Sequence, residues 1–161
     1  MTRPAAARPV QFEPEFIERL KDIFENKIVF NRVIGLEITS LTPEGAKGRI
    51  AMKPDLVGGY VQQRLHGGVI STGLDSMGGL AIMAAIGARH LDEPVLQRLH
   101  RFAKLGTIDL RVDYLRPAIG DMFTLQAEVI RLGSRVANTR MEFFGPEDKL
   151  VATGSAAYIV S

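Results

Sequence analysis

Hydrophobic and polar residues follow two different periods along this chain, and each period predicts a different kind of element. Between residues 14 and 26, apolar side chains recur at helical spacing with charged residues between them: Phe16, Ile17, Leu20, Ile23 and Phe24. This pattern is typical of an amphipathic helix that lies on another layer of the protein. Residues 1–12 contain Pro4 and Pro9, and we expect them to form a flexible N-terminal arm.

Shorter segments rich in branched residues predict strands. The first two, residues 33–41 and 45–52, are separated by a Thr-Pro-Glu-Gly turn and form a predicted hairpin. A loop containing Gly58-Gly59 then leads to His66. Four more strands are expected in the second half of the chain, over residues 107–115, 123–132, 134–144 and 150–160. A polar, basic connection precedes them, with a short helix expected over residues 93–101.

The strand over residues 107–115 has the clearest alternation. One face is expected to carry the apolar side chains, and the other is expected to carry Asp109, Arg111 and Asp113. Successive side chains of a strand point to opposite faces, so strict alternation groups the even-numbered residues together. These are Ile108, Leu110, Val112 and Tyr114.

The most apolar segment, residues 67–88, is too long for a strand and predicts a helix that is enclosed on most sides. Its length would also suit a membrane span. However, it contains Asp75, and a carboxylate near the middle of a bilayer costs about 2.5–3.5 kcal/mol, so we expect no membrane association. Gly73, Gly78 and Gly79 each disfavour a helix interior, and they predict the close approach of another backbone.

These elements together predict an α+β fold. An antiparallel sheet of about five to six strands would wrap around one long central helix. We find no repeat and no linker, so residues 13–161 are expected to form a single domain after the arm.

Composition excludes several classes of function. The chain has 161 residues with 20 basic and 18 acidic side chains, and a net charge of +2 is too small to indicate nucleic-acid binding. It has no cysteine, which excludes disulfides and thiolate nucleophiles and favours a cytoplasmic location. The three histidines lack metal-ligand spacing, and no metal site or redox cofactor is expected.

Candidate chemistry is concentrated where the loop enters the long helix, at His66-Gly67-Gly68. The first amides of a helix have no intrahelical acceptor, and without side chains at the two glycines a carbonyl oxygen could approach them closely. Such donors stabilise an oxyanion. The alternative is that the two glycines only turn the chain.

Asp75 is the second candidate, because an unpaired carboxylate in an apolar helix is costly. It either has a structural hydrogen bond or takes part in a reaction. Gly67 and Asp75 are eight residues apart, which is about 12 Å along a helix, so they cannot both touch one carbonyl group within one chain. An antiparallel two-fold dimer would bring them together, and a catalytic pair therefore predicts a homodimer or a dimer of dimers.

These residues resemble those of the hotdog-fold acyl-CoA thioesterases of the PaaI-like group. The resemblance covers residues 32–160 and rests on His66-Gly67-Gly68, on Asp75 nine positions after the histidine, and on the strand and turn TIDLRVDYLRPA that starts at Thr107. It implies that the Gly67 N–H polarises the thioester carbonyl. It also implies that Asp75 of the partner subunit is the nucleophile or the general base for water, and that Thr107 positions it.

The resemblance further implies that His66 orients the substrate and that Gly68 helps to begin the helix. The alternative for His66 is that it only braces the loop. Family members often have Asn or Gln six or seven residues before the histidine, where this chain has Gly59 and Tyr60. Gln63, or the adjacent Gln62, is the candidate replacement as a substrate-binding residue. Coenzyme A, present only as part of the substrate, could place its phosphates on the basic connection, at Arg89, Arg98, His100, Arg101 and Lys104. The alternative, which we favour, is that this connection is a solvated polar loop.

The function expected is hydrolysis of a short, medium or aromatic acyl-CoA thioester. Two alternatives remain open within the same fold, a non-catalytic acyl-CoA-binding module and a hotdog hydratase or dehydratase. A third is an enzyme of this fold with a different kind of substrate.

Overall fold

The N-terminal helix packs along one edge of the molecule. The computed structural model describes residues 11–161, so most of the predicted arm lies outside the described residues. α1 (Pro14–Asp22) continues as a π-helical turn (Ile23–Lys27), and α2 (Val29–Ile34) follows. The helix predicted over 14–26 is therefore helical throughout, with a wider last turn. Phe12, which the sequence places in the arm, is buried and packs on Phe16 with 4.9 Å between ring centroids.

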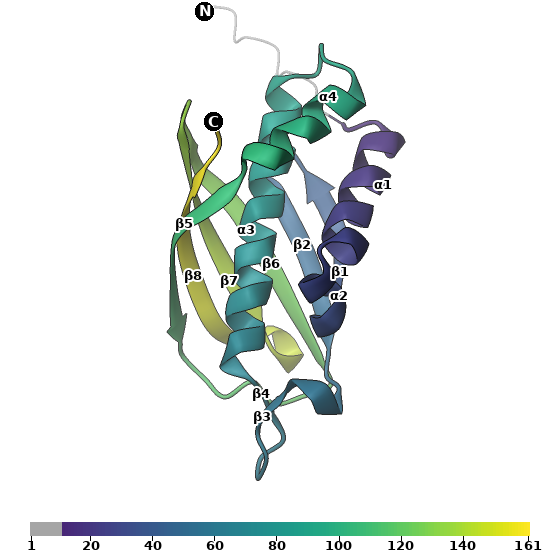
Figure 1. Cartoon of the computed structure of the whole chain (residues 1–161). Coiled ribbons are helices and arrows are strands. Elements are labelled where there is room, and N and C mark those ends of the chain that lie inside the picture. Colours follow the sequence, from purple (N-terminus) through teal and green to yellow (C-terminus); the bar gives the residue numbers. More distant parts are fainter. Residues whose placement is uncertain (1–10) are drawn as a thin grey trace, which may run out of the picture.

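Six strands form one antiparallel sheet in the order β1-β2-β6-β7-β8-β5, as Figure 1 shows. They are β1 (Leu36–Thr42), β2 (Gly45–Ala51), β5 (Gly106–Tyr114), β6 (Met122–Leu132), β7 (Val136–Phe144) and β8 (Leu150–Ile159). The strand predicted from residue 33 begins three residues later. Gly35, with φ of 73°, adopts the left-handed conformation that ends α2 before β1 starts. The predicted loop contains a small hairpin, β3 (Val57–Gly59) and β4 (Arg64–Leu65).

The predicted central helix is α3 (Gly67–Arg89), which lies across the inner face of the curved sheet (Figure 1). It is long and apolar enough to cross a membrane, but 72% of its most apolar window is buried inside the molecule. Leu74, Met77 and Leu80 are fully buried against inward side chains of β6 and β7 such as Phe123 and Phe143.

The glycines of α3 make room for side chains rather than for another backbone, which corrects the expectation. A Cβ at Gly73 would lie 2.7 Å from Leu125 Cδ2, and one at Gly79 would touch Leu105. At Gly78 the same space is occupied by the hydroxyl of Tyr158. The sheet therefore packs closely on α3 because bulky strand side chains are matched by glycines on the helix.

The basic connection folds over the C-terminal end of α3 as α4 (Val95–His100) and a 3₁₀ turn (Arg101–Lys104). Arg98 is fully buried there. Its guanidinium donates to Glu13 Oε1 at 2.6 Å and lies 4.7 Å from the centre of the Phe16 ring. This contact joins α4 to α1.

β5 is an edge strand, and its alternation is interrupted. Thr107 pairs with Tyr158 and Asp109 pairs with Ala157, so Ile108 is an extra residue in a β-bulge. As a result, Thr107 lies on the same inner face as Leu110, although strict alternation places the two on opposite faces. Ile108 is 57% exposed.

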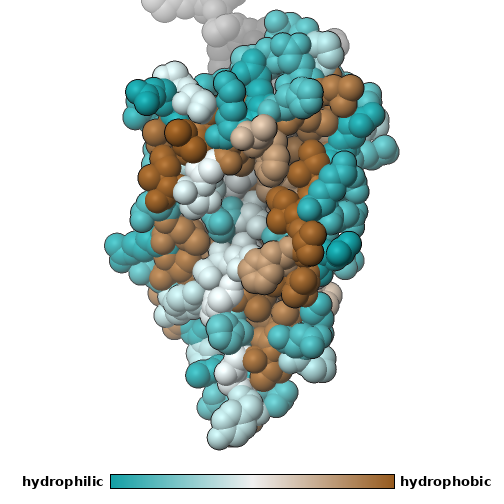
Figure 2. All heavy atoms as spheres, viewed as in Figure 1, coloured by the Kyte–Doolittle hydropathy of each residue, from teal (hydrophilic) through white to brown (hydrophobic). Residues whose placement is uncertain are grey.

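Figure 2 shows the face of the molecule that carries α3. A pale strip follows α3, and two hydrophobic bands flank it, one over β5 and one over α2. The exposed apolar residues include Val29, Phe30 and Val33 of α2. The face that carries α3 therefore exposes more apolar side chains than a helix face in contact with water alone usually does.

Candidate active site

His66 caps the N-terminus of α3. Its backbone is extended, and its Nδ1 accepts a hydrogen bond from the Gly68 amide at 2.8 Å. Its own amide donates to the Leu56 carbonyl at 2.8 Å, which fixes the cap against the preceding turn. Within residues 11–161, the Gly67 amide donates no hydrogen bond. It is therefore a free donor at the positive end of the helix.

The hairpin β3–β4 passes very close to this cap. A Cβ at Gly58 would lie 2.5 Å from His66 Cα, so only glycine allows the two backbones to approach. Gly58 thus helps to set the position of His66 and of the helix start.

Tyr114 of β5 reaches the same helix turn. Its hydroxyl donates to the Gly67 carbonyl oxygen at 2.9 Å, and its ring lies beside the Gly67 Cα. The sequence places Tyr114 on the apolar face of its strand but gives it no role in the site. A hollow of about 390 Å³ opens next to it, lined by residues that include Arg64, Gly67, Ile70, Tyr114 and Arg116.

Asp75 lies two turns further along α3 and is partly exposed. Its Oδ1 accepts a hydrogen bond from Thr107 Oγ1 at 2.9 Å and one from the Tyr158 hydroxyl at 3.2 Å. The structure thus brings Thr107 and Asp75 together, as the resemblance implies. Tyr158 was missed by sequence reasoning, because a tyrosine among alternating apolar residues is typical of a core strand.

Gln63 lies at the tip of the hairpin with φ of 49°. Its side-chain amide donates to the Tyr60 carbonyl at 2.7 Å and, in the part of the chain that the structure describes, makes no hydrogen bond to His66 or Asp75. The space next to Gly59 is filled by Arg64, whose Nε would be 2.5 Å from a Cβ there. The resemblance leads us to expect an Asn or Gln side chain at position 59 or 60. In this chain, the space beside Gly59 is instead occupied by the side chain of Arg64.

Two of the arginines expected to meet phosphates are already paired with carboxylates. Arg98 is buried on Glu13, and Arg101 pairs with Glu93. The pKa of the Glu93 carboxyl is lowered, mainly by the hydrogen bond from Arg101. The basic side chains that do lie beside Gly67 are Arg64 and Arg116.

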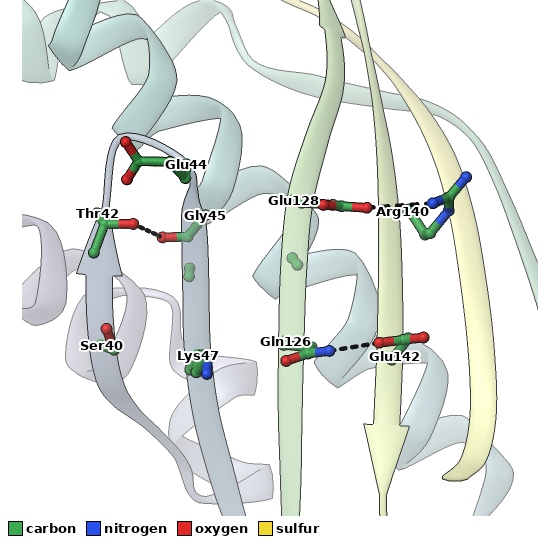
Figure 3. Close-up of a pocket in the computed structure, with 11 residues that line it drawn as sticks. Ser40, Thr42, Glu44, Gly45, Lys47, Gln126, Glu128, Arg140 and Glu142 are labelled. Atoms are coloured by element: carbon green, nitrogen blue, oxygen red, sulfur yellow. Dashed lines mark hydrogen bonds and ion pairs between the residues drawn. The ribbon is translucent and has the colours of Figure 1, made fainter. Parts of the chain in front are cut away.

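A further hollow of about 530 Å³ lies on the outer face of the sheet, away from α3 (Figure 3). The polar residues that line it pair largely with one another, such as Gln126 with Glu142 and Arg140 with Glu128. Its lining includes neither the start of α3 nor Asp75. Within residues 11–161, no three His, Cys, Asp or Glu residues gather as they would around a metal ion.

Comparison with known proteins agrees with this arrangement. The family described as "Thioesterase superfamily" matches residues 62–152, which include the cap, Asp75 and Thr107. The chain belongs to the thioesterase superfamily. It is 38% identical over 141 residues to the medium/long-chain acyl-CoA thioesterase YigI of Escherichia coli, a match that covers 86% of this chain and 90% of the relative. The YigI protein of Salmonella typhimurium is 37% identical over the same share of each chain.

A crystal structure from Shewanella oneidensis, of a protein described as related to the thioesterase superfamily, superposes with a TM-score of 0.85. It has 39% sequence identity, and the match covers 93% of this chain and 100% of that one. The predicted hotdog fold, an antiparallel sheet around one long helix, is confirmed for this thioesterase-superfamily chain.

Proposed function

We propose that this chain is an acyl-CoA thioesterase that acts as a dimer on medium- or long-chain substrates. The observation that carries the proposal is the Asp75 carboxylate, held at the surface of α3 by a hydroxyl from β5. The free Gly67 amide at the start of the same helix supports it. The acyl length comes from the YigI relatives, which are named for medium and long chains. It extends the short, medium or aromatic range expected from the sequence.

The proposed mechanism uses two groups of α3, the Gly67 amide at its start and the Asp75 carboxylate two turns further along. The Gly67 amide, aided by the helix dipole, stabilises the negative charge that develops on the thioester oxygen. The Asp75 carboxylate either attacks the carbonyl carbon, giving a mixed anhydride that water hydrolyses, or removes a proton from the attacking water. In both routes the C–S bond breaks, and the electron pair leaves with the sulfur of coenzyme A.

We infer the dimer from the distance between the two groups. Gly67 and Asp75 are separated by about 12 Å along α3, so one substrate carbonyl needs Gly67 of one protomer and Asp75 of its partner. The uncovered edge of β5 and the hydrophobic bands on the α3 face support this assembly. With acyl-CoA as the substrate, we place the reaction in the cytoplasm.

The non-catalytic module is the second candidate, favoured by the glycine at position 59 where an amide was expected. Hydrolysis over a panel of acyl-CoAs of increasing chain length separates the two. We expect turnover that is highest for medium or long chains and falls at least about a hundredfold in Asp75→Asn. Asp92→Asn, an exposed aspartate beyond the other end of α3, is the matched control and should keep full activity. Saturable binding without turnover would favour the module instead.

A further inference from the structure

Tyr158 is buried directly behind Asp75. It lies on β8, is 2% exposed, and projects from the inner face of the sheet toward α3. Its hydroxyl is 2.9 Å from the Asp75 backbone oxygen and 3.2 Å from Asp75 Oδ1. The mechanism described above makes no use of this group.

Tyr158 and Thr107 approach the carboxylate as a pair. They are cross-strand partners of β8 and β5, and the bulge at Ile108 places Thr107 on the inner face. The Thr107 hydroxyl donates to Oδ1 of Asp75, and the single proton of the Tyr158 hydroxyl is shared between the same Oδ1 and the Asp75 backbone oxygen. Within residues 11–161, Oδ2 accepts no hydrogen bond. The carboxylate is therefore anchored through one oxygen and exposes the other.

The environment of Tyr158 keeps its proton in place. Burial raises the pKa of the Tyr158 phenol well above its usual value, and the negative charge of Asp75 raises it further. The phenol thus remains a donor throughout the working pH range. Gly78 leaves the space that the hydroxyl occupies, since a Cβ there would overlap it.

We propose that Tyr158 is a positioning residue that, together with Thr107, holds Asp75 Oδ1 so that Oδ2 is the reacting oxygen. This inference rests on the proposed function. In the nucleophilic route, Oδ2 forms the C–O bond as C–S breaks, and water then hydrolyses the anhydride. In the general-base route, Oδ2 accepts a proton from the water whose oxygen forms the C–O bond. In each case the departing sulfur takes the electron pair and is then protonated.

The test is Tyr158→Phe, which removes only the hydroxyl. We expect kcat to fall by about tenfold to a hundredfold, as for loss of a hydrogen bond to a charged group, with KM unchanged within about twofold. In the Asp75→Asn background the same change should add little further loss, because the group that it positions is already disabled.

Phe123→Leu is the matched control, since Phe123 is a fully buried ring on β6. It should lower thermal stability but leave kcat and KM unchanged below the melting temperature. The inference is overturned if Tyr158→Phe keeps the wild-type kcat. It is also overturned if Phe123→Leu loses kcat to the same extent.

Crystal structures separate failure of this inference from failure of the proposed function. If the wild-type protein hydrolyses no acyl-CoA, the proposed function is overturned. The orientation of the Asp75 carboxylate can still be read from the crystal structures, so the inference is tested separately. We expect Asp75 to be anchored through one oxygen in the wild type and to adopt another rotamer in Tyr158→Phe. An unchanged Asp75 orientation in the variant overturns the inference by itself.

Discussion

The imidazole Nδ1 of His66 accepts a hydrogen bond from the amide of Gly68, with 2.8 Å between the two nitrogen atoms. This cap uses the second amide of α3 and leaves the first, that of Gly67, without a partner in the described chain. A substrate oxygen at this helix end therefore meets Gly67 rather than Gly68. In the motif His66-Gly67-Gly68, the histidine therefore accepts the cap hydrogen bond, the Gly67 amide is a free donor, and the Gly68 amide is the donor that the cap uses.

Gly67→Pro is expected to remove the free donor while preserving the helix. Proline lacks an N–H and is favoured at the first position of a helix, and the extended backbone of His66 suits a residue before proline. We expect kcat for acyl-CoA hydrolysis to fall by about a hundredfold to a thousandfold, as on loss of one oxyanion donor. Circular dichroism should show an unchanged helix content. A variant that retains full kcat would contradict the role proposed for this amide.

Mixing two inactive variants is expected to restore activity if each site uses two protomers. A heterodimer of Gly67→Pro and Asp75→Asn contains one site with both wild-type groups and one with neither. After unfolding and refolding of an equimolar mixture, about a quarter of the wild-type rate should return. If both groups acted within one chain, the mixture would be no more active than its components.

His66→Ala is expected to destabilise the protein through the loss of the cap. An N-cap substitution by alanine costs about 1 kcal/mol, which urea unfolding can measure. His66→Asn supplies another cap acceptor and should recover most of that stability. Equal stability of His66→Ala and the wild type would show that the imidazole contact contributes nothing to the helix start.

Acid is expected to weaken the contact between α1 and α4. The hydrogen bond from Arg98 lowers the pKa of the Glu13 carboxyl below its ordinary value of 4.5. The unfolded chain therefore binds this proton more readily, and the contribution of Glu13 is present above pH 4.5 and lost as the pH falls through the folded pKa. Unfolding measured against pH should show a shallower acid slope in Glu13→Gln than in the wild type. Glu18→Gln, which replaces an exposed glutamate on the same helix, should keep the wild-type slope.

Sequence patterns predict the main helices and strands in their order, because period-two and helical spacing and the length of the apolar segment are local properties. They do not predict α2, whose last residues were expected in a strand, or the hairpin β3–β4. The sequence also indicates which residues of α3 are candidates for a catalytic role. A glycine pair where a loop enters a helix and a carboxylate in an apolar segment are unusual wherever they occur. The alternation of β5 and the resemblance, however, disagree about Thr107, and the pattern alone places it on the outer face.

The groups that surround Asp75 depend on contacts between distant parts of the chain. The bulge at Ile108 turns Thr107 inward because β8 fixes the register of the edge strand on both sides of the extra residue. Tyr158 reaches Asp75 across 83 residues of chain, and Gly78 leaves room for its hydroxyl. Arg98 is buried because Glu13 and Phe16 converge on it from the other end of the sequence. These contacts depend on non-local packing, which no short-range pattern records.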